Sequence, residues 1–202
     1  DLTAFCEAIG LRDAVGIGHS LGGGIVALCA ERSPRTFASL FLLEPDYSFD
    51  DEFYSRGVRR KSRPPRTWSS RSELQTYLGQ HKMAGRWRDD VLQDVVLHEA
   101  METEDGSIVM KWAMQSLDIA DGANGPYDLR PMFKGLMMPV SFILGEETAS
   151  NYADLSRIAT ARPGFSSVTV TGAGHNMYME RPDAVAGLIK SFVAGEDLPS
   201  TV

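Results

Sequence analysis

The sequence predicts an α/β fold, in which a parallel sheet is covered by helices and carries an inserted helical module. Short, largely apolar runs occur at residues 14–17, 39–43, 140–144 and 167–171, and helical patterns alternate with them. Runs of this length that alternate with helices are typical of parallel strands buried on both faces. A further observation is that residues 46–136 interrupt this alternation of strands and helices.

Helical patterns precede and follow the predicted strands. Near the start of the chain, apolar residues recur at helical spacing and Gly10 supplies a stop signal; they are Leu2, Phe5, Cys6 and Ile9. A glycine-rich turn leads from the first strand into an apolar helix that ends by Pro34. The last helix begins at Pro182, which suits the first turn of a helix. We expect these helices to cover the sheet.

The pattern divides the chain into three parts. Residues 1–45 and 137–195 form the predicted core, residues 46–136 an inserted, mainly helical cap, and residues 196–202 a loose tail. The insert concentrates large apolar side chains, which can pack together or line a substrate site; they are Trp68, Trp87, Trp112, Met83, Met101, Met110, Met114 and Met132.

Composition excludes several classes of protein. Of the 202 residues, 43% are apolar, which excludes a mainly disordered chain. The net charge of −7 argues against a nucleic-acid partner, and no apolar run approaches the roughly 18 residues of a membrane span. Cys6 and Cys29 lie far apart without metal-site spacing, so we expect two buried free thiols in a reducing compartment. No signal-peptide pattern opens the chain, and a cytoplasmic location is predicted.

The strongest motif is G-x-S-x-G at residues 18–22, set between a buried strand and an apolar helix. A nucleophile elbow requires this context, because the serine occupies a sharp strand-to-helix turn with small neighbours. Ser20 is the candidate nucleophile. Gly18 and Gly22 are expected to let helix and strand approach, and Gly23 and Gly24 to keep the start of the helix close to the sheet. The backbone N–H of Leu21, at the helix N-terminus, is the expected oxyanion donor. We expect His19 to pack inside the elbow.

A glycine-rich dinucleotide-binding turn is the competing interpretation of the same segment. Gly16, Gly18 and Gly22 follow a strand, as in that class of site. The G-x-G-x-x-G fingerprint fails, because Leu21 stands at its third glycine position. A cofactor-binding oxidoreductase is therefore the least favoured function.

A second motif follows the last predicted strand, where residues 172–176 read GAGHN. His175 lies on a loop at the carboxyl end of a parallel strand, and from there it can reach a nucleophile at the end of another strand. The chain order Ser20 before His175 agrees with a Ser–His hydrolase. His175 is the candidate general base.

Together these segments resemble α/β-hydrolase-fold serine hydrolases that carry a helical cap. The segments are GHSLGG, LLEP, PVSFILGEE and GAGHNMYMERPDAV, and the resemblance runs from Asp1 to about Val193. It implies that Ser20 is the nucleophile, that His175 is the base, and that an acid orients His175. It also implies a small-molecule acyl substrate and no metal or organic cofactor.

The acid departs from the pattern of the family that the chain resembles. Such proteins commonly carry the acid as G-x-x-D after the strand at residues 140–144, and here Thr148 takes the place of that Asp. Glu44, at the end of the preceding sheet strand, is the favoured acid, with Glu146 or Glu147 as the alternative. We expect a Glu44 carboxylate oxygen within hydrogen-bonding distance of His175 Nδ1.

The resemblance also predicts an N-terminally truncated fold. The family has several strands before the point where this chain begins, including the strand whose loop gives a second oxyanion donor. We therefore expect about four parallel strands, with an exposed edge at residues 14–17, association through that edge, and weak activity for these residues alone.

The predicted function is cleavage of an ester, thioester or related acyl bond by a serine hydrolase. Ser20, His175 and Glu44 form the expected triad, through an acyl-enzyme that water resolves. The alternative is a non-catalytic relative that keeps the site for ligand or partner binding. Its support is the irregular acid position.

Overall fold

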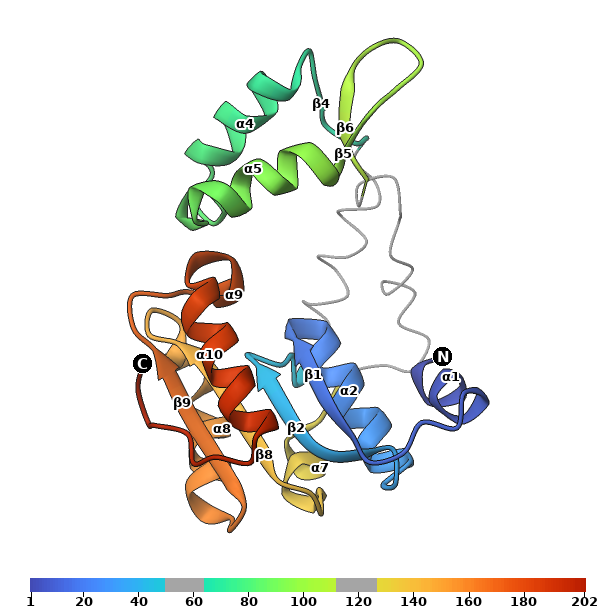
Figure 1. Ribbon diagram of the computed structural model, residues 1–202, viewed down its shortest axis with the longest axis vertical. Coiled ribbons are helices and arrows are strands. Elements are labelled where there is room, and N and C mark those ends of the chain that lie inside the picture. Colours follow the sequence, from blue (N-terminus) through green and yellow to red (C-terminus); the bar gives the residue numbers. More distant parts are fainter. Residues whose placement is uncertain (50–63, 112–126) are drawn as a thin grey trace. The chain divides into compact units, whose positions relative to one another are not determined.

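The computed structural model describes residues 1–49, 64–111 and 127–202, and it contains two compact units (Figure 1). The first unit comprises Asp1–Ser48 and Tyr127–Val202, and the second comprises Phe49–Pro126. Residues 46–48 and 127–136, which the sequence pattern assigned to the insert, lie in the first unit. Residues 50–63 and 112–126 of the predicted insert lie outside the described residues.

A four-stranded sheet forms the centre of the first unit, which confirms the predicted α/β fold. Its strands are β1 (Ala14–His19), β2 (Phe37–Leu43), β8 (Val140–Gly145) and β9 (Phe165–Val170). They pair in the order β1-β2-β8-β9, and all three pairings are parallel. Among the described residues, β1 pairs with β2 alone and so lies at one edge of this sheet. The carboxyl ends of the four strands share one edge of the unit, where the candidate residues lie.

Helices cover both faces of this sheet (Figure 1). Contacts link α2 (Ser20–Arg32) to α7 (Arg130–Gly135) and α7 to α8 (Ala153–Ala161), so these three helices line one face. On the other face, α10 (Pro182–Val193) packs against Phe41 and Leu43 of β2. From Leu40 to Leu43 every residue of β2 is buried, because this part of the strand is central in the sheet, which explains its run of large apolar side chains.

The first helix, α1 (Leu2–Ala8), is packed only in part. Cys6 is buried, but Phe5 and Ile9, which follows the helix, are more than half exposed although both belong to the predicted apolar face. Cys6 and Cys29 are buried free thiols, as predicted. In the described part of the chain, no helix is both long enough and apolar enough to span a membrane.

The C-terminal residues, expected to be loose, pair with the edge strand β9. Thr201 forms a parallel bridge with Thr169, and the N–H of Thr171 donates to the carbonyl of Val202 at 2.7 Å. An edge strand offers unpaired backbone groups, and a following segment that reaches them satisfies both partners. The tail therefore belongs to the folded first unit.

The described part of the second unit contains two helices and a small sheet. Its helices are α4 (Arg71–Gln80) and α5 (Asp89–His98), joined through the short η1 (Ala84–Arg86). An antiparallel sheet of β4 (Thr67–Trp68), β6 (Ile108–Met110) and β5 (Ala100–Glu102) completes the described part. Strands of two or three residues are too short to show an alternating pattern, so the sequence did not predict them.

Four further short elements belong to the part of the chain near the site-bearing edge of the sheet. β3 (Ser48–Phe49) and β7 (Tyr127–Asp128) form a two-stranded sheet where the chain leaves this unit and returns to it. η3 (Ala149–Tyr152) follows β8, and α9 (Met177–Glu180) follows the loop that carries His175.

Candidate active site

Ser20 occupies the sharp turn between β1 and α2 that the motif predicts. Its φ of 51° lies in the left-handed region, which non-glycine residues rarely adopt. A Cβ on Gly18 would lie 2.7 Å from the carbonyl oxygen of Gly22, so this position needs glycine. A Cβ on Gly22 itself would meet no atom within 4 Å outside its own helix, and the expectation that Gly22 allows the close approach is wrong.

Gly23 and Gly24 provide a close approach at the start of α2, as expected. A Cβ on Gly23 would lie 2.8 Å from Cβ of Pro45, and one on Gly24 would lie 2.5 Å from the carbonyl oxygen of Asp46. The segment after β2 therefore packs directly on the first turn of α2. The backbone N–H of Asp46 also donates to the carbonyl of Ser20 at 2.8 Å.

Two hydrogen bonds join the three predicted site residues. His175 Nε2 lies 3.1 Å from Ser20 Oγ, and His175 Nδ1 lies 2.7 Å from Glu44 Oε2. The Glu44 side chain is fully buried, whereas the His175 side chain is 27% exposed. The structure thus brings Ser20, His175 and Glu44 together, at the distance expected between Glu44 and His175.

Glu44 reaches this position through an unusual backbone and three polar contacts. Its φ of 38° turns the chain at the end of β2. While Oε2 faces His175, Oε1 accepts the N–H of Gly145 at 2.8 Å and the hydroxyl of Thr148. A buried carboxylate needs such partners, because its desolvation is otherwise costly. Thr148, which stands where the resemblance led us to expect an acid, donates to the acid on the neighbouring strand.

The alternative acids lie elsewhere. Glu146 and Glu147 are exposed on the turn after β8. Glu146 Oε2 accepts the backbone N–H of Gly172 at 2.8 Å. The carboxylate that accepts the hydrogen bond of His175 Nδ1 is therefore that of Glu44.

Leu21 lies in the first turn of α2, immediately after Ser20. The N–H groups of a first turn have no acceptor within the helix, and the helix dipole adds positive potential there. The expected oxyanion donor is therefore at the start of a helix of 13 residues that begins at the nucleophile.

Two polar side chains of the site were missed by the sequence reasoning. The Ser20 hydroxyl also lies within donating distance of Asp46 Oδ2, at 3.4 Å. The Tyr152 hydroxyl lies 3.5 Å from His175 Nδ1. Burial, with the nearby carboxylates of Glu44 and Asp46, raises the pKa of Tyr152 well above its ordinary value, so its phenol stays protonated. For Asp46 the sequence offered one signal, its proximity to Glu44 in the chain. For Tyr152 it offered none.

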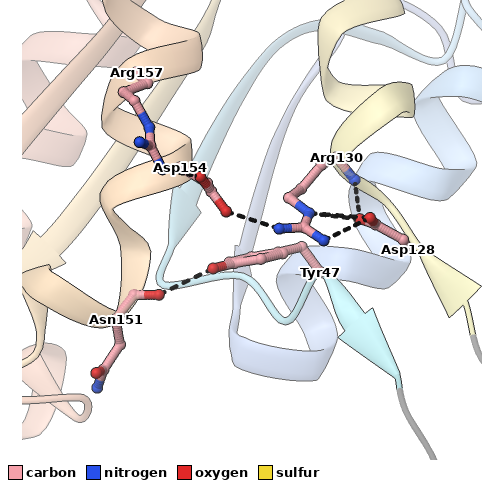
Figure 2. Close-up of polar contacts among 6 residues, drawn as sticks. All are labelled: Tyr47, Asp128, Arg130, Asn151, Asp154 and Arg157. Atoms are coloured by element: carbon pink, nitrogen blue, oxygen red, sulfur yellow. Dashed lines mark hydrogen bonds and ion pairs between the residues drawn. The ribbon is translucent and has the colours of Figure 1, made fainter.

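A polar network holds the segment after β2 against the segment after β8 (Figure 2). The Tyr47 hydroxyl donates to the carbonyl of Asn151 at 2.9 Å. Arg130 donates to Asp128 and Asp154, each at 2.8 Å, and keeps the pKa of both carboxyls below the usual range. Ion pairs this exposed add little stability. The Tyr47 hydrogen bond joins the segments that carry Asp46 and Tyr152, and the Arg130 pairs join the start of α7 to α8.

The parallel sheet, the serine turn and the late histidine loop define an α/β-hydrolase fold. The chain belongs to the Alpha/beta hydrolase family, whose model matches residues 1–188. No curated protein matches this chain.

Solved structures share this fold at low sequence identity. An E-2-(acetamidomethylene)succinate hydrolase is 20% identical, with a TM-score of 0.75 over 96% of this chain and 71% of its own. The thioesterase domain from the curacin biosynthetic pathway is 16% identical, with a TM-score of 0.69 over 94% and 71%. A carboxylesterase from Bacillus subtilis is 20% identical, with a TM-score of 0.61 over 97% and 65%.

Proposed function

We propose that the protein is a serine hydrolase that cleaves an ester, thioester or related acyl bond. The observation that carries the proposal is the continuous hydrogen-bonded series from Ser20 Oγ through the His175 ring to Glu44, with contacts of 3.1 Å and 2.7 Å. Nucleophile, base and orienting acid in this order are the parts of a Ser–His–acid mechanism.

In this mechanism, Ser20 Oγ attacks the acyl carbonyl carbon while His175 Nε2 takes the hydroxyl proton. Glu44 holds the Nδ1–H of His175 and stabilises the imidazolium that forms. The N–H of Leu21 donates to the tetrahedral oxyanion. His175 then gives the proton to the leaving group as the carbon–leaving-group bond breaks, and an acyl-enzyme remains. Water, deprotonated by His175, then attacks the acyl carbon, the bond to Ser20 Oγ breaks as His175 returns the proton to that oxygen, and the acid is released.

The substrate class follows from the chemistry and from the neighbours. Thioesterase and carboxylesterase structures share the fold, which supports an acyl substrate of small-molecule size. The mechanism itself needs no metal or organic cofactor, because the side chains supply both nucleophile and proton transfer. The negative net charge supports the absence of a nucleic-acid partner. A cytoplasmic location stays a prediction.

The alternative proposal is a non-catalytic relative that uses the site for binding. The observation that favours it is Asp46, whose carboxylate lies 3.4 Å from Ser20 Oγ. The serine has one proton to donate, so Asp46 competes with His175 for it. A hydroxyl that points to Asp46 is not activated for attack.

Fluorophosphonate labelling separates the two functions in the full-length protein. We expect wild type to label and to hydrolyse short-chain p-nitrophenyl esters, and Ser20→Ala to lose labelling and about 10⁴-fold or more of the activity. Ser33→Ala, at the opposite end of α2, is the matched control and should retain both. A folded wild type that neither labels nor turns over ester would support the binding role.

A further inference from the structure

The residue before the nucleophile makes a contact that the proposed mechanism does not use. His19 is the last residue of β1, and its Nε2 lies 2.8 Å from the backbone carbonyl oxygen of His175. A carbonyl oxygen only accepts, so His19 must donate through a protonated Nε2. The contact therefore fixes which ring nitrogen of His19 carries the proton.

Ring contacts hold the His19 imidazole in the same place. Its centroid lies 4.6 Å from the His175 ring and 4.8 Å from the ring of Tyr178, which belongs to α9. Burial and then the neighbouring His175 ring lower the pKa of His19, and the hydrogen bond to the His175 carbonyl and the Glu44 carboxylate oppose them only in part. His19 is therefore neutral near pH 7, so no second cation lies beside His175 when that ring is protonated.

The hydrogen bond connects the residue next to the nucleophile with the backbone of the base. Ser20 is the next residue after His19, and the hydrogen bond of His19 ends on the main chain of His175, although 156 positions separate His19 from His175 in the chain. The loop around His175 has a second tie, since the N–H of Gly174 donates to Glu180 Oε2 at 2.9 Å. A loop held at two points presents its imidazole at a defined distance from Ser20 Oγ.

We propose that His19 is a positioning residue, which anchors the His175 carbonyl and so sets the distance between His175 Nε2 and Ser20 Oγ. This inference rests on the proposed hydrolase function and deepens it. The rate of proton transfer falls steeply as donor and acceptor move apart. A displacement of about 1 Å at a reacting group can lower the rate about 10²-fold. Loss of the anchor allows part of that displacement.

Two substitutions distinguish the anchor from simple packing. His19→Gln keeps a side-chain N–H that can reach the His175 carbonyl but removes the aromatic ring. His19→Phe keeps an aromatic ring against Tyr178 but removes the donor. A packing role predicts that Phe is the better replacement, and an anchoring role predicts that Gln is.

The test measures kcat and KM for a p-nitrophenyl ester, the rate of fluorophosphonate labelling and Tm. For His19→Phe we expect kcat and the labelling rate to fall about tenfold, with KM and Tm close to wild type. His19→Gln should stay within about threefold of wild type in kcat. Wild-type kcat in His19→Phe, or equal losses in both variants, would overturn the anchoring role.

A measurement that does not require turnover separates this inference from the proposed function. The low-field proton resonance of His175 Nδ1–H, hydrogen-bonded to Glu44, should persist in wild type and His19→Gln and should broaden or vanish in His19→Phe. If wild type neither labels nor hydrolyses ester, but its resonance is present and is lost in His19→Phe, the proposed function fails while the anchor stands. If the resonance is unchanged in His19→Phe, the anchor fails.

Discussion

The carboxyl ends of β2 and β8 lie side by side, yet only the end of β2 supplies the carboxylate that contacts His175. Leu43 pairs with Ile143, so both strands finish at the same edge of the sheet. β2 turns sharply at Glu44, whose side chain is fully buried, whereas β8 continues into a turn with exposed glutamates and Thr148. The difference shows that the carboxylate on His175 is selected by its place at the sheet edge, and a carboxylate moved to the end of β8 tests whether that position can serve the same histidine.

The largest expected effect comes from removing the charge of Glu44. Glu44→Gln keeps the shape of the side chain but cannot stabilise the imidazolium or fix its tautomer, so kcat should fall about 10³–10⁴-fold. Steady-state ester hydrolysis measures the loss. Glu146→Gln is the matched control, since its amide oxygen can still accept the N–H of Gly172, and its activity should match wild type. The reverse result would move the acid to the end of β8.

A second prediction concerns the close contact between the end of β8 and the histidine loop. A Cβ on Gly145 would lie 2.4 Å from the carbonyl oxygen of Gly174, so Gly145→Ala must displace the backbone next to His175. We expect kcat to fall about 10²-fold and the free energy of unfolding to fall by about 1–3 kcal/mol.

Gly187→Ala is the control for this substitution. Its Cβ would meet nothing within 4 Å, and it lies inside α10, so Tm should stay level or rise slightly. Equal activity of Gly145→Ala and wild type would show that the end of β8 and the loop that carries His175 are not tightly coupled.

A third prediction concerns a carboxylate moved from the end of β2 to the end of β8. The Thr148 hydroxyl touches Glu44 Oε1, so an aspartate at position 148 would place its carboxylate close to the same histidine. Adding Thr148→Asp to Glu44→Gln should recover about tenfold of the lost kcat. The single variant Thr148→Asp, with two carboxylates together, should lose activity. No recovery in the double variant would show that only β2 can carry the acid.

The smallest expected effect comes from the hydroxyl that joins the two strand ends. Thr148→Val removes one of the hydrogen bonds to the buried Glu44 carboxylate, so we expect kcat to fall about fivefold and Tm to fall by a few degrees. Thr148→Ser keeps the hydroxyl and should stay close to wild type in both measurements. Equal effects of Val and Ser would assign the loss to packing of the threonine methyl group.

Local patterns determined much of this protein from the sequence alone. Short apolar runs predicted all four parallel strands, most strongly the central β2 and β8, because strands buried on both faces must be apolar along most of their length. The G-x-S-x-G spacing predicted the turn at Ser20, because its steric demands fall on residues next to one another in the chain. The position of His175 after the last strand followed from the same parallel topology.

Only the tertiary structure decided which acid contacts His175, since 131 positions separate Glu44 from His175 in the chain and three glutamates were available. The same holds for Asp46 beside Ser20 and for the His19 anchor on the His175 carbonyl. Such contacts depend on strand register and on the direction of single side chains, and neither leaves a periodic signal in the sequence. The pairing of the C-terminal residues with β9 has the same cause, because backbone hydrogen bonds form between whichever segments meet, whatever side chains they carry.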